Sequence, residues 1–176
     1  MGNTFPGFEA TVTTLGQVHA RIHQGLFFSA DHNDPALASS GIMNILIRPA
    51  ATVSMHTRFN IVTGGDAQVW LFEGTTFSVA GTAVPSVNRN RFSPHTAQAL
   101  LTSGPTITGD GTELLTGLIV GGKSGQSSGG VRESFEEWIL RVGEVYLVRV
   151  QNLNAQAQPI DVGIDFYEPL GKLRTT

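Results

Sequence analysis

Regular alternation of apolar and polar residues along the chain predicts β-strands. Between Val53 and Ile61, apolar or near-apolar side chains occupy every second position, with polar side chains between them. The run from Ile160 to Phe166 repeats this pattern. Successive side chains of a strand point to opposite faces, so each segment should bury one face and expose the other. We therefore predict a half-buried strand in both places.

Other segments predict strands and turns by their composition. They are short, rich in β-branched or aromatic residues, and bounded by Gly, Pro, Asn or Asp. These segments are Met43–Arg48, Gln68–Phe72, Leu114–Val120 and Val145–Val150. Thr63–Asp66, which contains two glycines, predicts a hairpin turn. Residues 17–25 fit both a helix and a strand. Val18 and Ile22 are four apart, as on one face of a helix, but Val18, Ala20 and Ile22 also alternate with polar residues, as in a strand. We expect a strand there.

The strands and turns predict an all-β protein with an antiparallel β-sandwich or barrel. No long segment shows the helical period that the crossover helices of a parallel α/β sheet would need. The 176 residues suit one domain, and we place a single β-sandwich domain at residues 17–169. Residues 1–16 lack alternation and are interpreted as an extended N-terminal arm carrying Phe5 and Phe8. Residues 170–176 are interpreted as a C-terminal tail, and residues 121–130 as a flexible Gly/Ser-rich loop.

Composition narrows the range of functions. Charged residues make up 14% of the chain, well below the roughly 25% usual for soluble domains. This fits a surface partly covered by partners, or a neutral exterior of Thr, Ser and Asn. The net charge is −3 without a run of Lys or Arg, so direct nucleic-acid binding is not expected. The sequence has no cysteine and no apolar stretch long enough to span a membrane. Residues 1–16 lack a basic region followed by an apolar block, so a secretory signal is not expected there.

The histidines are the first candidates for a metal site, as in a cupin-like metalloenzyme. The sequence has five histidines but no His-x-His pair. His19 and His23 are four apart, a spacing that suits a shared metal on a helix. On the expected strand they would lie about 13 Å apart, too far to share a metal. We therefore expect surface or interface histidines, with no metal and no cofactor.

Carboxylates, serines and aromatic residues give no catalytic site. Asp161 and Asp165 share a strand face, but about four rises of 3.3 Å separate them, more than a glycosidase pair allows. The sequence contains no Gly-x-Ser-x-Gly motif. Trp70, Phe72 and Trp138 lie in strand-like runs and are expected in the core, with a sugar-stacking platform as the alternative. No catalytic residue is predicted, and the protein is not expected to be an enzyme.

One polar segment remains, Asn88, Arg89, Asn90 and Arg91. Arginine pairs with carboxylates through two parallel hydrogen bonds and is enriched at protein interfaces. Asparagine side chains can equally satisfy the turns of their own loop. Two interpretations therefore stay open, contact with a partner and ordering of the loop itself.

A series of motifs along the chain resembles a known class of viral proteins. The motifs are His19–Gly25, Phe72–Gly74, Gly81–Thr82 followed by residues 88–91, Trp138–Leu140, Tyr146–Val150 and Asp165–Glu168. In this order they resemble the small β-sandwich proteins that decorate or cement the capsids of tailed bacteriophages. The resemblance covers the chain from about Val18 to Pro169.

The resemblance implies a jelly roll, which strand spacing alone does not separate from an immunoglobulin-like sandwich. It implies a non-enzymatic structural protein of the virion, a homotrimer that binds the major capsid protein and stabilises adjacent capsomers. The protein would then reside on the capsid surface, and in the host cytoplasm during assembly. The candidate interface residues are Phe5, Phe8, Asn88, Arg89, Asn90 and Arg91. The alternative is the receptor- or glycan-binding head of a phage fibre.

Overall fold

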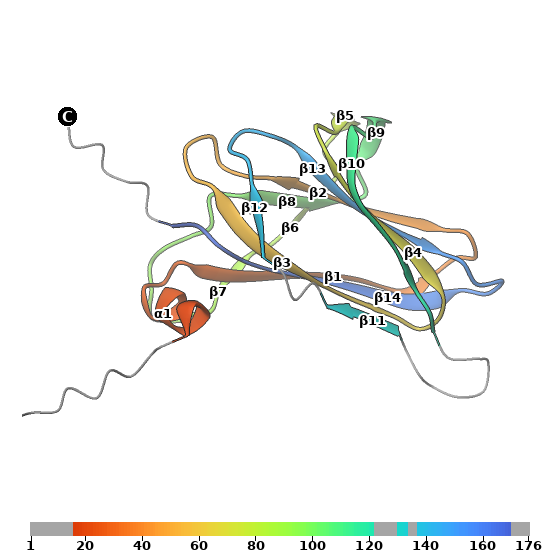
Figure 1. Cartoon of the computed structure of the whole chain (residues 1–176), viewed down its shortest axis with the longest axis horizontal. Helices are drawn as coiled ribbons and strands as arrows, with labels where there is room; N and C mark the ends of the chain where they lie inside the picture. Colours follow the sequence, from red (N-terminus) through yellow and green to blue (C-terminus); the bar gives the residue numbers. More distant parts are fainter. Residues whose placement is uncertain (1–15, 122–129, 134–136, 170–176) are drawn as a thin grey trace, which may run out of the picture.

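The computed structural model describes residues 16–121, 130–133 and 137–169, and within these ranges two antiparallel sheets pack face to face (Figure 1). The first sheet has the order β11 (Gly130–Glu133), β3 (Met55–Thr63), β14 (Gln158–Tyr167), β1 (Phe27–Leu37), β7 (Val87–Asn88), and β12 (Trp138–Leu140) also pairs with β3. The second has the order β10 (Thr112–Ile119), β4 (Ala67–Glu73), β13 (Tyr146–Asn152), β2 (Ile42–Arg48), β8 (Leu100–Ser103), β6 (Thr82–Val84). This architecture confirms the predicted all-β antiparallel sandwich.

Several predicted segments lie outside the described residues. These are the N-terminal arm with Phe5 and Phe8, the C-terminal tail, and residues 122–129 of the Gly/Ser-rich loop. The six strands predicted from alternation or composition are all present, as β2, β3, β4, β10, β13 and β14. In β3 the residues at 55, 57, 59, 61 and 63 are buried, while those between them are half-buried or exposed, as the alternation predicts.

The core lies between the two sheets. Its largest fully buried side chains come from both layers. Phe28, Phe166 and Ile164 belong to the first sheet, and Ile45, Leu71 and Val148 to the second. The rings of Phe28 and Phe166 stack with their centroids 5.4 Å apart. Burial of this apolar surface is the main driving force for packing the two sheets together.

A second, smaller cluster explains why the second sheet lacks clean alternation. Leu46, Phe72 and Leu147 point away from the main core, yet they are buried. A two-stranded ribbon is formed by β5 (Thr76–Val79) and β9 (Thr106–Gly109) (Figure 1). Its Phe77 and Ile107 pack against these three residues. Because this ribbon covers part of the outer face, β2 and β13 are apolar on both sides there.

The segment at residues 17–25 is a helix, α1 (Gln17–His23), so the predicted strand is wrong. Its C-terminal end explains the difference. Gly25 adopts φ 69°, the left-handed region that favours glycine. Its N–H donates to the carbonyl of Ile22 at 2.9 Å, and the N–H of Leu26 donates to that of Arg21 at 3.0 Å. This pair of bonds is a Schellman motif, which closes an α-helix.

Two other features differ from the sequence interpretation. Thr63–Asp66 joins β3 of one sheet to β4 of the other, so it is a turn between sheets and the predicted hairpin is wrong.

β1 was not predicted, because its polar half hides the alternation. Pro35 lies within it, where the register with β14 shifts between Asp34 and Leu37. A proline that cannot donate to the ladder is accommodated at such an irregularity.

Candidate interaction surface at the α1 end of the sandwich

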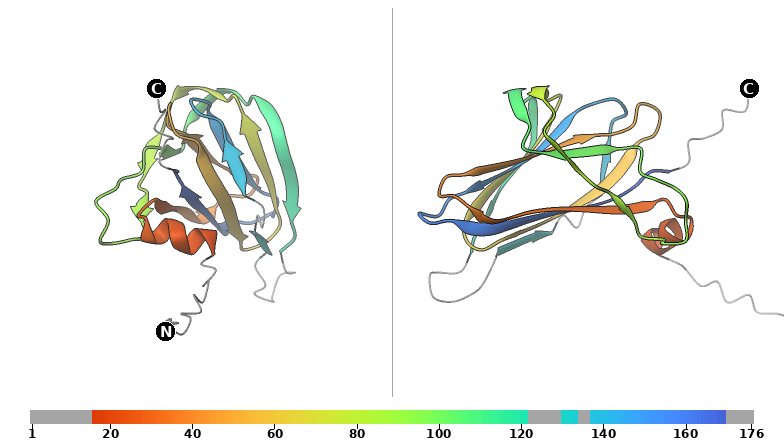
Figure 2. Two further views of the ribbon diagram at one scale, coloured as in Figure 1. Left: turned by 60° about the vertical axis from the view of Figure 1, so that its left-hand side comes forward. Right: turned by 180° about the vertical axis from the view of Figure 1, so that it is seen from behind.

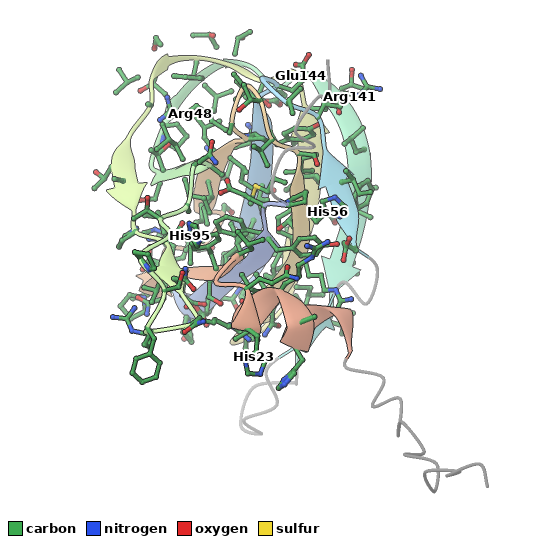
Figure 3. All side chains as sticks on the ribbon, turned by 90° about the vertical axis from the view of Figure 1, so that its left-hand side faces the viewer. His23, Arg48, His56, His95, Arg141 and Glu144 are labelled. Atoms are coloured by element: carbon green, nitrogen blue, oxygen red, sulfur yellow. The ribbon has the colours of Figure 1, made fainter. Side chains whose placement is uncertain are left out.

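One end of the sandwich gathers α1, the beginning of β1, the end of β14 and the loop at residues 89–99 (Figures 1 and 2). The N–H of Glu168, just after β14, donates to the carbonyl of Leu26, just before β1, at 3.2 Å. Figure 3 looks onto this end, with α1 across the lower part and His95 and His56 on either side above it. We call this region the α1 end. It contains the four polar residues that the sequence singles out.

Asn88 ties the loop to the end of the helix. Its side-chain Nδ2 donates to the carbonyl of Gly25 at 2.8 Å and to that of His95 at 2.9 Å. Its Oδ1 accepts from the N–H of Asn90 at 2.9 Å, which closes an Asx turn. Gly25 must stay small, because a Cβ there would lie 2.0 Å from Oγ of Ser93. Helix, turn and loop therefore form one packed unit.

Asn90 makes a second turn of the same kind. Its Oδ1 accepts from the N–H of Phe92 at 3.1 Å, and its Nδ2 donates to the carbonyl of His23 at 3.1 Å. The two asparagines thus order the loop over successive residues and attach it to α1. Among the described residues, both asparagine amides bond within their own chain, as the loop-ordering interpretation expects. A role for either residue at an interface stays a prediction.

Arg89 also bonds within the chain. Its Nε donates to Oγ of Ser29 at 2.6 Å, and one terminal nitrogen donates to both carboxylate oxygens of Asp165 at 2.7 and 2.9 Å. The guanidinium lies 5.1 Å from the centre of the Phe27 ring. The side chains of Arg89 and Asp165 are 44% and 40% exposed, so solvent screening keeps the pair to about 0–1 kcal/mol of stability. The pair orients the loop more than it stabilises the fold.

Arg91 and Phe92 are the residues of this loop that point outward. The Phe92 side chain is 100% exposed, and Arg91 is exposed with no hydrogen bond or ion pair to the described part of the chain. The same loop borders a hollow of about 280 Å³, whose lining includes Asn90, Arg91 and Pro94. Aromatic and arginine side chains are the residue types enriched at protein interfaces.

Glu168 holds the far side of the loop. Only 4% of this residue is exposed, yet it carries a carboxylate. Oε1 accepts from the N–H of Ala99 at 2.6 Å, and Oε2 accepts from the N–H of Gln98 at 2.8 Å. Hydrogen bonds from backbone N–H groups to a carboxylate are among the stronger ones in proteins. The loop is therefore anchored at both ends, by Asn88 at its start and by Glu168 at its close.

A polar cluster joins three elements beside α1. The carboxylate Oε1 of Glu137 lies 2.6 Å from Nδ1 of His56 and accepts from the Tyr167 hydroxyl at 2.8 Å. The rings of His56 and Tyr167 stack at 4.5 Å, and the guanidinium of Arg21 lies 5.2 Å from the centre of the Tyr167 ring. Burial and then the bond to Glu137 raise the pKa of Tyr167 to about 12. The phenol therefore stays a donor at neutral pH.

The carboxyl group of Glu137 is held in its charged form. Burial acts to raise its pKa, but the hydrogen bonds from His56 and Tyr167, together with the charges of His56 and Arg58, outweigh burial, so the pKa of Glu137 lies below its ordinary value of 4.5. A carboxyl whose pKa falls on folding stabilises the fold above that ordinary value. This stabilisation is lost as the pH falls through the lowered pKa.

Replacing Glu137 with glutamine should therefore destabilise the protein mainly near neutral pH. We expect a loss of about 1–3 kcal/mol at about pH 7, because two partners lose a charged acceptor. The loss should shrink as the pH falls from about 5 towards 3. Urea unfolding at several pH values measures this, with Glu113→Gln, an exposed carboxyl on β10, as the control. A loss that does not change with pH would contradict the argument.

The remaining candidate side chains occupy structural places. Trp70 packs against the outer cluster of the second sheet and Trp138 against the main core, while Phe72 is buried. Asp161 is exposed on β14, four residues before Asp165, which is bound by Arg89. Within the described ranges, no group of three or more His, Cys, Asp or Glu side chains is arranged to hold a metal ion. No helix in those ranges has the length and apolarity needed to cross a membrane.

The resemblance to capsid decoration proteins stays a prediction made from the sequence motifs. No family model, curated protein or solved structure matches the chain.

Proposed function

We propose that this protein is a non-enzymatic structural protein of a tailed-phage virion, which binds the outside of the capsid and stabilises adjacent capsomers. The observation that carries the proposal is the loop at the α1 end, which presents a fully exposed Phe92 beside the exposed Arg91. Bonds to its own chain fix this loop before any partner binds. Little conformational entropy is then lost on binding, which favours affinity.

The division of roles within the loop follows from these contacts. Asn88 and Asn90 hold the loop on α1, and Arg89 holds it on Asp165. Phe92 would enter an apolar pocket of the partner, and Arg91 would pair with a carboxylate beside that pocket. Repetition of this modest contact by the symmetry of a capsid, and by a homotrimer, would raise the overall affinity.

The strand order supports a jelly roll as the scaffold for this role. Four strands of one sheet run β11-β3-β14-β1, and four of the other run β10-β4-β13-β2. Among these eight strands the chain passes between sheets at β1–β2, β2–β3, β3–β4, β10–β11, β11–β13 and β13–β14. We infer from these crossings the double Greek key of a jelly roll, an architecture that viral capsid domains use.

Binding to capsids tests the proposal. Capsids of the encoding phage, assembled without this chain, should bind the purified protein and become more resistant to heat. Phe92→Ala combined with Arg91→Ala should weaken binding about tenfold or more, because both outward side chains are lost. Asn60→Ala, an exposed change on β3, serves as the control.

The outcomes separate two parts of the proposal. A wild-type protein that does not bind these capsids contradicts the virion function itself. Binding that the loop variant retains in full contradicts only the placement of the contact at Arg91 and Phe92. Light scattering during size-exclusion chromatography tests the trimer, and a monomer at micromolar concentration would contradict it.

A further inference from the structure

Two histidines on α1 lie one helical turn apart with one ring nitrogen of each in contact. The Nε2 atoms of His19 and His23 are 2.9 Å apart, and the ring centroids are 4.5 Å apart. Both residues are exposed, and Figure 3 shows His23 pointing away from the sheets. The short separation allows a hydrogen bond between the two rings, whose donor and acceptor depend on the tautomer of each imidazole.

The spacing matches that of two neighbouring ligands on a transition-metal ion. Imidazole nitrogens bind such ions at about 2.0–2.1 Å, so two of them at right angles lie about 2.9 Å apart. Right angles between neighbouring ligands are found in square-planar and tetragonal coordination, which Cu²⁺ and Ni²⁺ prefer. A tetrahedral ion such as Zn²⁺ would require the two nitrogens to move apart slightly.

The rest of the α1 end holds the helix that carries the pair. A helix of seven residues is too short to be stable alone. Here the Schellman motif at Gly25 closes it, and the amide of Asn90 bonds the carbonyl of His23. The two imidazoles are therefore presented on a fixed backbone, so little order must be gained when an ion binds.

We propose that His19 and His23 form a surface site for one divalent transition-metal ion, with Cu²⁺ and Ni²⁺ bound more tightly than Zn²⁺. The two imidazoles fill neighbouring coordination positions, and water fills the others. We do not expect Mg²⁺ or Ca²⁺ to bind at this site, because these ions prefer oxygen ligands. The site goes beyond the proposed function and does not depend on it.

Titration of the whole chain with CuCl₂ or NiCl₂ tests the site. Calorimetry in a non-coordinating buffer at about pH 7 should show one ion bound per chain, and the electron paramagnetic resonance of Cu²⁺ should show two nitrogen ligands. Affinity should fall as the pH is lowered, because metal and protons compete for the same nitrogens. His19→Ala and His23→Ala should each weaken binding about tenfold or more.

Two controls keep the test specific. Exchanging neighbours, His23→Gln together with Gln24→His, keeps the composition but turns the second imidazole away from the first, so it should also weaken binding. His95→Ala removes a histidine of the same end and should leave binding unchanged. Circular dichroism of each variant without metal confirms that the fold is kept. Metal binding that survives both the alanine variants and the exchange overturns the proposal, as does a wild-type chain that binds no Cu²⁺ at millimolar concentration.

Discussion

Replacing Phe166 with alanine should lower the free energy of unfolding by about 3–5 kcal/mol, a large share of the 5–15 kcal/mol typical of a folded domain. Phe166 is 0% exposed, and its ring stacks on that of Phe28 at 5.4 Å. It lies on β14 between β1 and β3, opposite Phe28 and Thr57. The lost side chain leaves a cavity in the core between the two sheets, which the paired strands around it cannot readily close.

The same substitution at Phe92 provides the matched control. Phe92 is 100% exposed, so Phe92→Ala removes the same atoms without opening a cavity and should change stability by less than about 0.5 kcal/mol. Urea unfolding of both variants at about pH 7, followed by tryptophan fluorescence, measures the difference. Equal stability losses in the two variants would contradict the assignment of Phe166 to the core and of Phe92 to an outward surface.

The strands that the sequence predicts best have one face packed on the core and the other exposed to solvent. β3 and β14 lie with one face on the core and the other towards solvent, so their period of two is visible in the residues. β2 and β13 are buried on both faces where the β5–β9 ribbon covers them. There the run of apolar residues still predicts a strand, but which face meets the core cannot be decided without knowing about the ribbon.

The helix at residues 17–23 could have been predicted from its end. Seven residues contain only two turns, so the four-residue spacing of Val18 and Ile22 competes with an alternation that is equally short. Gly25 followed by the buried Leu26 is the stronger signal, because glycine directly after a helix with an apolar residue next marks a Schellman motif. The strand interpretation also separated His19 from His23, whose rings come into contact only on a helix.

The sequence identifies the polar loop at residues 88–91 as a candidate site, but it does not predict the role of each side chain in it. The polarity of residues 88–91 identifies the loop, yet it does not say which side chains turn inward. Asp165, Gly25 and His23 receive them, and these residues are far away in the sequence. Phe92, which carries the proposed contact, was not predicted as a site residue. A single aromatic residue in a polar segment forms no repeating apolar pattern that would indicate which way it points. Its full exposure is visible only once the loop has been closed by its neighbours.

At the opposite end of the sandwich, replacing Asn152 should be about as damaging as replacing Phe166. Asn152 is 0% exposed, and its Nδ2 donates to the carbonyls of Leu37, Ala38 and Gln156 at 2.9–3.0 Å. Its Oδ1 accepts from the N–H of Asn154 at 2.8 Å. One buried amide thus serves the turn after β1 and the turn between β13 and β14.

Asn152→Ala should cost about 3–4 kcal/mol, because buried carbonyls lose their donors and water cannot readily replace them. Asn152→Asp, which keeps the shape but replaces the donor with a charged acceptor, should cost more still at about pH 7. Asn60→Ala, on an exposed face of β3, should stay within about 0.5 kcal/mol of the wild type. Urea unfolding orders the variants; an aspartate variant as stable as the wild type would mean that shape, and not hydrogen bonding, is what this end of the sandwich requires of residue 152.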